Sequence, residues 1–450
     1  MIHPSPRAYA TARRRPFTDA WLREMGALFY APFDTEHGSN VWTRGKGFQT
    51  APSTETVDAD GTFVAKRSRL ITPARANVLR VEQLGALLEG TRTNICKQSE
   101  DFATTWSDVN GTVDVASNAE VAPDGNTTAD TLTDNAAGVV EGIRNNSIVV
   151  VDDSNPFVAS IYVKATTSAT TFPTLRIGVS GGATVQATVN FDTNDGTFTN
   201  HATQIPDSAV SEREGDYWRI QIRATNDSSG NTTGFFDIFP ASDEALSGVP
   251  VGSVTVWGAQ FEQNATFASS YIPTTTGSVA RTAEDIDYII TDEDLVTAPD
   301  GAFGGVVTPE YDGADVGADA YVFDLSTAND GLRGFFDQSN DGKFTVIVDS
   351  GGAPVATLVA ASAPSRGVSF DFFVTWRNGD FVLYKDGVPE ATDTGGAAPT
   401  AVGTHVFLGQ TRGNASQGFI NFGQGLLLER DPGAGVIGQI RREMRLRAAA

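Results

Sequence analysis

The sequence contains six tryptophans and nine tyrosines, whose ring faces could stack on the pyranose rings of a carbohydrate. Trp218, Trp257 and Trp376 lie in or at the end of segments in which apolar and polar residues alternate, so we assign them to hydrophobic cores. Trp42 and Trp106 lie in less regular segments. We therefore predict Trp42 and Trp106 as the candidate carbohydrate-binding residues.

Acidic loops are the other candidate ligand sites, because Ca2+ prefers carboxylate and amide oxygens. Such loops occur at residues 292–294, 312–319 and 340–342. None has the complete twelve-residue pattern of a calcium loop, and a solvated acidic turn is the favoured interpretation of each. We predict no cofactor, we leave a structural Ca2+ open, and the metal ligands stay unassigned.

The sequence lacks the signatures of common enzyme sites. His3, His37, His201 and His405 do not have the spacing of metal ligands, and the single Cys96 can complete neither a zinc site nor an intrachain disulfide. Nucleophile-elbow, phosphate-loop and dinucleotide motifs are absent. A glycosidase needs two converging carboxylates, which cannot be identified or excluded among 55 acidic residues. We predict a protein that is not an enzyme, with a polysaccharide depolymerase as the distant alternative.

The charge distribution limits the partners. The formal net charge of −23 would repel nucleic acid and anionic lipid. The first 30 residues instead hold five arginines against two carboxylates, and residues 436–450 hold four arginines against one carboxylate. Basic ends on an acidic body suggest docking onto an acidic neighbour. We predict attachment to a particle through five arginines of the N-terminal arm, namely Arg7, Arg13, Arg14, Arg15 and Arg23.

Targeting signals are not evident in the chain. No run of eighteen apolar residues occurs, so no membrane insertion is expected. The segment Arg13-Arg-Arg-Pro-Phe17 is followed by charged residues where an export signal needs an apolar run. We expect no signal peptide.

Apolar residues recur with period two in many short segments, which Gly, Asn, Asp and Ser clusters separate. Residues 157–163, 217–223 and 254–261 are examples before residue 283, and residues 343–349 and 370–376 are examples after it. Residues 18–28 and 435–446 instead have helical spacing. Many strands without intervening helices predict an all-β fold of two antiparallel β-sandwich (jelly-roll) domains in tandem, with an extended N-terminal arm and short terminal helices.

The change in composition between residues 273 and 300 gives the main domain boundary. The predicted organisation has five parts: an Arg-rich attachment arm with a short helix (1–30), a β-rich wrapping segment (31–94), a first sandwich (95–283), a second sandwich (284–435) and a short basic helix (436–450).

Several motifs occur in a characteristic order. They are Val57-Asp-Ala-Asp-Gly61, Leu87-Leu-Glu-Gly-Thr-Arg-Thr-Asn94, Ser99-Glu-Asp-Phe102, Ala122-Pro-Asp-Gly125, Trp257-Gly-Ala-Gln-Phe-Glu262 and Ser269-Ser-Tyr-Ile-Pro-Thr274. Taken together, they resemble landmarks of a group of tailed-bacteriophage virion proteins. In that group they open and close a jelly roll similar to carbohydrate-binding modules. The resemblance covers residues 40–285.

A second resemblance covers residues 300–435. The segments Phe373-Val-Thr-Trp376, Val382-Leu-Tyr-Lys-Asp-Gly387 and His405-Val-Phe-Leu-Gly409 resemble a concanavalin A-like or laminin-G-like sandwich. The local chemistry agrees, because Asp386-Gly387 favours a tight turn between two strands. The family implies a further all-β domain.

The resemblance implies a structural protein of a tailed-bacteriophage virion. We predict a tail fibre, spike or baseplate component that binds host surface glycan, assembles with other virion proteins in the host cytoplasm and binds no nucleic acid. A head decoration or head-fibre protein anchored to the capsid is the alternative. A homo-oligomer is expected, and a trimer is one form that it could take.

Overall fold

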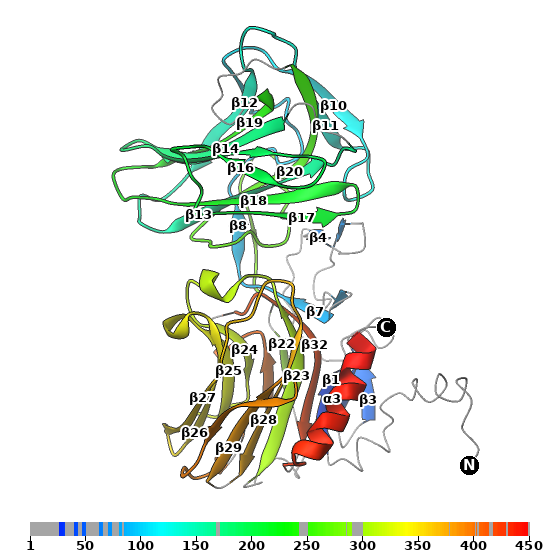
Figure 1. The fold of residues 1–450 in the computed structure, drawn as a ribbon, viewed down its shortest axis with the longest axis vertical. Coiled ribbons are helices and arrows are strands. Elements are labelled where there is room, and N and C mark those ends of the chain that lie inside the picture. Colours follow the sequence, from blue (N-terminus) through cyan, green and yellow to red (C-terminus); the bar gives the residue numbers. More distant parts are fainter. Residues whose placement is uncertain are drawn as a thin grey trace, which may run out of the picture. The chain divides into compact units, whose positions relative to one another are not determined.

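The computed structural model describes backbone and side chains for residues 86–167, 173–242, 251–284, 300–377, 379–400, 402, 405–413, 417–428 and 431–442. It describes the backbone alone for residues 27–31, 40–43, 47–50, 63–65, 71–73, 81–82, 85, 172 and 286–289 and for the end of the last helix, 443–448. The chain forms two compact units: unit 1 comprises residues 1–56, 77–90 and 283–450, and unit 2 comprises residues 57–76 and 91–282. The predicted all-β class with antiparallel sheets is confirmed (Figure 1).

Unit 2 is a sandwich of two six-stranded antiparallel sheets. In spatial order, the first sheet contains β10 (Asp114–Glu120), β11 (Ala129–Asp134), β20 (Gly252–Gln263), β13 (Pro156–Lys164), β18 (Tyr217–Thr225) and β17 (Ser208–Glu214). The second contains β16 (Phe198–Asn200), β15 (Val185–Phe191), β14 (Phe172–Ser180), β19 (Thr233–Ser242), β12 (Gly142–Val149) and β9 (Ser107–Val109). Two short pairs complete the unit, β4 (Phe63–Ala65) with β5 (Ile71–Pro73) and β8 (Arg92–Asn94) with β21 (Val279–Arg281).

The core of unit 2 lies between its two large sheets. The inward residues follow the alternation seen in the sequence, for example Ile161 in β13, Ile220 in β18 and Ile177 in β14. Each of these side chains is fully buried. Burying branched apolar side chains from both sheets stabilises the sandwich by about 1.5 to 3 kcal/mol per side chain.

Unit 1 is a second sandwich. Its large sheet runs in the order β3 (Gly47–Thr50), β2 (Asn40–Thr43), β1 (Ala27–Ala31), β32 (Ile420–Leu428), β23 (Gly301–Pro309), β28 (Phe370–Arg377), β29 (Asp380–Lys385) and β30 (Val388–Asp393), with β7 (Gly85–Leu88) also on β32 and β6 (Val81–Glu82) on β7. Its six-stranded sheet contains β22 (Ile286–Ile289), β31 (His405–Leu408), β24 (Ala320–Asp324), β25 (Gly331–Asp337), β26 (Lys343–Ser350) and β27 (Ala353–Val359).

Aromatic rings from both sheets fill the interior of unit 1. Phe303 of β23 contacts Phe323 of β24, with ring centroids 4.7 Å apart. Phe323 in turn stacks on Phe372 of β28 at 5.4 Å. Because these rings come from facing sheets, they determine how the two layers interlock.

The predicted C-terminal helix exists and covers the outer face of the large sheet. Helix α3 (Ala434–Ala448) lies along β23 and β32 in Figure 1. Its Ile437 and Ile440 are buried against residues of β23, β28 and β32. Arg441 anchors the helix further, since its Nε donates to the carboxylate of Asp371 at 2.8 Å. The predicted N-terminal helix begins outside the described residues.

Strand β32 joins segments that are far apart in the sequence. One of its edges pairs along its whole length with β23, and its other edge pairs with β1 and with β7. The strands β1 and β7 precede residues 91–282 of unit 2 in the chain, whereas β23 and β32 follow them. Unit 1 is therefore interrupted in sequence by most of unit 2.

The packing of α3 yields a first prediction. Ile440→Ala removes a fully buried side chain between the helix and the sheet, and it should lower the free energy of unfolding of unit 1 by about 2 to 4 kcal/mol. Urea unfolding followed by hydrogen exchange of peptides from residues 300–428 measures the effect. Gln439→Ala, at the exposed neighbouring position, is the control and should change little. Equal stability of the two variants would contradict the packing role.

Candidate functional site

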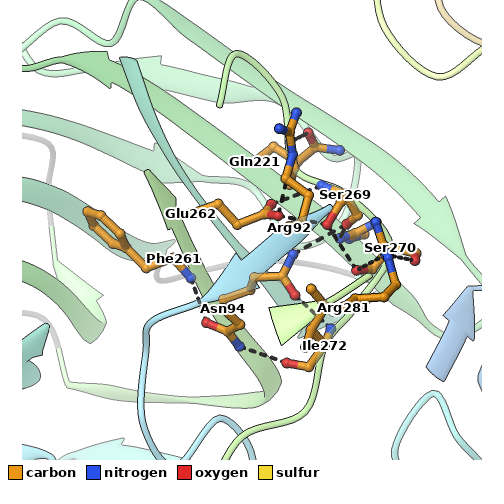
Figure 2. Close-up of polar contacts among 12 residues, drawn as sticks. Arg92, Asn94, Gln221, Phe261, Glu262, Ser269, Ser270, Ile272 and Arg281 are labelled. Carbon is orange, nitrogen blue, oxygen red and sulfur yellow. Dashed lines mark hydrogen bonds and ion pairs between the residues drawn. The ribbon is translucent and has the colours of Figure 1, made fainter. Parts of the chain in front are cut away.

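The sequence motifs at the two ends of unit 2 meet in a buried polar cluster. Asn94 is its centre: Nδ2 donates to the carbonyl oxygens of Ala259 and Ile272 at 3.1 and 2.8 Å. Its Oδ1 accepts from the backbone N–H groups of Cys96 and Phe261, both at 3.0 Å (Figure 2). A carboxamide offers two donor hydrogens and two acceptor lone pairs, so every hydrogen-bonding position of Asn94 is used.

A second set of contacts holds the segment that follows β20. Glu262 is fully buried, and its carboxylate accepts from the backbone N–H of Ser269 at 2.9 Å and from its hydroxyl at 2.7 Å. The Nε of Arg92 lies 3.8 Å from the same carboxylate. Arg281 donates to the hydroxyl of Ser270, also shown in Figure 2.

These contacts identify the role of the motifs. The residues come from β8, β20, β21 and the segment 265–275, and Arg281 and Glu262 are almost completely buried. Buried charges and amides require partners, and here they find them within the domain. We call the set of Arg92, Asn94, Glu262, Ser269, Ser270 and Arg281 the polar clasp. It fastens the two ends of unit 2 to its last long strand, so its chemistry is structural.

The structure gives Trp106 a core position. Its side chain is 8% exposed and packs against Phe102 and Phe236, with ring centroids 4.9 and 6.0 Å apart. Its Nε1 donates to the carbonyl of Gln98 at 3.2 Å. Because the ring is enclosed by the core, it offers no open face to a sugar. The irregular sequence around Trp106 suggested a carbohydrate-binding residue, whereas the ring lies in the core of unit 2.

For the other predicted site residues, the structure describes at most the backbone. Trp42 is in β2, opposite Tyr30 of β1 and Phe48 of β3, but its side chain lies outside the described residues. Arg7, Arg13, Arg14, Arg15 and Arg23 also lie outside them. Of the tryptophans assigned to cores, Trp257 and Trp376 are buried, and half-buried Trp218 packs against the core of unit 2.

Two of the predicted acidic loops are described. In residues 312–319, the carboxylates of Asp312 and Asp319 accept backbone N–H groups of Arg366 and Gln338. In residues 340–342, Asp341 takes the left-handed conformation, with φ of 56°. Within the described part of the chain, no three His, Cys, Asp or Glu side chains gather as metal ligands. The loop at 292–294 lies outside it.

An exposed face with ring and charged side chains occurs on the six-stranded sheet of unit 1. Half-buried Tyr321 of β24 stacks on Phe335 of β25, with centroids 5.0 Å apart and planes 20° apart. On β31, half-buried His405 and Phe407 stack at 5.6 Å and 9°. Val406 and Leu408 are buried, so alternation directs His405 and Phe407 to the opposite face. Tyr321 lies opposite Phe335, whose strand neighbour Phe336 is in the core, and the register of β24 shifts between Tyr321 and the interior Phe323.

Charged groups lie on the same face. Arg333 of β25 is opposite Asp324 of β24, and its Nη1 lies 2.7 Å from Oδ2 of Asp349. Burial raises the pKa of Asp349, Arg333 opposes this shift, and Asp324 and Asp330 add to it. Burial also raises the pKa of Tyr321, which keeps its hydroxyl protonated and able to donate at neutral pH.

We call Tyr321, Arg333, Asp349, His405 and Phe407 the aromatic face. Phe407 and Arg333 lie on the two sides of Asp324, about two inter-strand spacings or roughly 10 Å apart, a distance that an oligosaccharide can span. Aromatic faces contact the C–H groups of a sugar, while Arg and Asp bind its hydroxyls. The sequence alone indicated no ligand role for these residues. A signal was present in the sequence, since aromatic residues occupy outward positions of strands in which apolar and polar residues alternate.

No family model matches the chain, and no curated protein matches it. Solved structures similar to parts of it include the receptor-binding domain of botulinum neurotoxin C/D mosaic serotype (9% identity over 36% of this chain and 40% of that one, TM-score 0.29), Caenorhabditis elegans galectin LEC-6 (12%, 32% and 89%, 0.23) and domain 4 of AbnA, an arabinanase from Geobacillus stearothermophilus, in complex with arabinotriose (15%, 40% and 80%, 0.27).

The chain spans 40% of the length of the first of these toxin domains. All three likenesses are too distant to carry an argument about function, which therefore rests on the residues. Among the helices that the structure describes, none is long and apolar enough to span a bilayer.

The polar clasp yields a second prediction. Asn94→Ala leaves two buried backbone N–H groups and two buried carbonyls without their side-chain partner, at about 1 to 3 kcal/mol per unsatisfied group. Unit 2 should lose several kcal/mol of stability, measured by hydrogen exchange of peptides from residues 95–280 in urea. Asn126→Ala, at an exposed loop position, is the matched control. Unchanged exchange in Asn94→Ala would show that the clasp does not hold the unit together.

Proposed function

We propose that the protein is a non-enzymatic, glycan-binding structural component of a tailed-bacteriophage virion, in a tail fibre, spike or baseplate. The observation that carries the binding role is the aromatic face of unit 1, where Tyr321 and Phe407 present half-exposed rings beside the Arg333–Asp349 ion pair. The ordered motifs of the sequence support the virion assignment. Their residues have a structural role in the polar clasp, which fits a shared domain framework better than a shared ligand site.

The mechanism would depend on rigid presentation in many copies. A single shallow face with two stacked ring pairs binds a sugar weakly, because much of the ligand stays in water. Several copies on one particle raise the effective concentration and hence the avidity. A homo-oligomer attached through the arginines of the N-terminal arm would provide these copies.

The binding role gives a third prediction, tested with immobilised glycans and with titration of the oligosaccharides retained. Phe407→Ala removes a ring from the face, and it should weaken binding by about ten-fold, corresponding to about 1.4 kcal/mol. Arg333→Lys keeps the charge but loses the planar fork, so it should also weaken binding. Val388→Ala, at a 58% exposed position elsewhere in unit 1, should bind normally. Normal binding by both site variants would reject the aromatic face.

The virion assignment is tested independently. An antibody against the purified protein, labelled with gold, should decorate the tails of phage particles produced by bacteria that carry the encoding genome. Label on the head would support a head decoration or head-fibre protein instead. Absence of the protein from purified particles would overturn the virion assignment while leaving the glycan-binding result intact. Sugar release from host polysaccharide would support the depolymerase alternative.

A further inference from the structure

A row of charged residues crosses the outer face of the second sheet of unit 2. Arg144 of β12 and Arg176 of β14 both lie directly opposite Asp237 of β19, one on each side. The Nε and Nη2 atoms of Arg144 donate to the carboxylate of Asp237 at 2.6 and 2.8 Å. Those of Arg176 lie at 2.6 and 2.5 Å from its Oδ2. We call these three residues the arginine row.

Two phenylalanines support the arginines from the same strand as Asp237. The Cζ of Arg144 lies 4.5 Å from the ring centroid of Phe235, and the Cζ of Arg176 lies 5.1 Å from that of Phe239. Both rings are nearly or fully buried. Each guanidinium is therefore held by an ion pair at one edge and by a ring against its plane.

Two glycines make room for these rings. Phe235 lies against Gly178 of β14, and Phe239 lies against Gly142 of β12. A Cβ atom at either glycine would come within 2.4 Å of the neighbouring ring. The same arrangement of arginine, ring and glycine thus occurs on both sides of Asp237. It holds both guanidinium groups rigidly.

The arginine row has more positive charge than its own structure requires. Asp237 is fully buried and needs a cation, which one arginine would supply. The second arginine leaves a local charge of +1 in a protein whose net charge is −23. The arginine side chains are 33% and 16% exposed, so the excess charge is accessible.

Unused donors remain on both arginines. A guanidinium has five N–H donors, and the contacts with Asp237 engage two nitrogen atoms of each arginine. The row ends at exposed Ser107 of β9, which lies opposite Arg144. On the other side, Thr188 of β15 lies opposite Arg176, but it is fully buried and its hydroxyl donates to Gln204. Fixed guanidinium donors at the surface suit the carboxylate of an acidic sugar.

We propose that the arginine row is a second saccharide site, selective for sugars that carry a carboxylate, such as uronic or sialic acids. The ligand carboxylate binds the remaining guanidinium N–H donors of Arg144 and Arg176. The site is separate from the aromatic face in residues and in unit, so either can be tested without the other. The positive charge of the arginine row selects an acidic sugar. Carboxylates predominate around the aromatic face, which therefore disfavours one.

The test uses the full chain and calorimetric titration with 3′-sialyllactose and tri-galacturonate. Lactose and maltotriose are the neutral counterparts, and sodium sulfate is the free anion. We expect measurable binding of at least one acidic sugar, weakening with added salt, and no binding of the neutral sugars at the same concentrations. Sulfate should neither bind comparably nor displace the sugar at equal concentration.

Ser107 provides the decisive variants because it is exposed and lies beside Arg144 without taking part in the ion pairs. Ser107→Glu places a carboxylate in the row and should weaken binding of the acidic sugar by about ten-fold through repulsion and competition for Arg144. Ser107→Gln, of similar size and without charge, should bind like the unaltered protein. Thermal melting of both variants checks that unit 2 remains folded.

Three results would overturn the proposal. They are no binding of either acidic sugar, equal binding of the neutral sugars or sulfate, and equal affinity in Ser107→Glu and Ser107→Gln. Phe407→Ala, which alters the aromatic face, should bind the acidic sugar normally. Loss of acidic-sugar binding in Phe407→Ala, with Ser107→Glu unaffected, would assign that binding to the aromatic face instead.

Discussion

The hydrogen bonds of one buried carboxamide define how unit 2 begins and ends. Asn94 satisfies two backbone N–H groups and two carbonyls where β8 meets the end of β20 and the segment after it. No water replaces these partners in a closed interior, so the backbone of 259–272 depends on a side chain more than 160 residues earlier. These bonds hold the C-terminal end of the sandwich in place. The outer faces of its sheets take no part in them.

The two outer faces with exposed charge illustrate different solutions to one problem. A sheet in a sandwich has one face in the core and must make the other compatible with water. On the arginine row, buried Asp237 is compensated by two cations that rest on phenylalanine rings. On the aromatic face, half-exposed Tyr321 stacks on buried Phe335, and half-exposed His405 and Phe407 stack on each other, on the same face as the Arg333–Asp349 pair. The aromatic face keeps apolar area beside hydrogen-bonding groups, the combination that recognises sugars, whereas the rings of the arginine row are buried and leave guanidinium donors at the surface.

The proposed adhesive role follows from this division of tasks. Cores and the polar clasp provide rigidity, while the faces provide chemistry that can change without loss of the fold. Two weak sites of opposite preference on one chain would let a multivalent assembly discriminate between surfaces bearing neutral and acidic glycans. The discrimination would come from the arrangement of many copies, since each site alone buries little of its ligand.

The sequence by itself determined the all-β class, most strands and the buried positions of Trp257 and Trp376, because alternation with period two is a local property of a strand. Alternation also shows which residues share a face, but it does not say which ring stays exposed, and so Tyr321 and Phe407 were not identified and Trp106 was predicted as a carbohydrate-binding residue. Only the tertiary structure decided that β1, β7 and β23 all pair with β32, and that Asn94 bonds to Ile272. Such pairings depend on the packing of segments that are far apart in the sequence. The loop-closure entropy and the contact free energy that decide them are not properties of any short stretch of sequence.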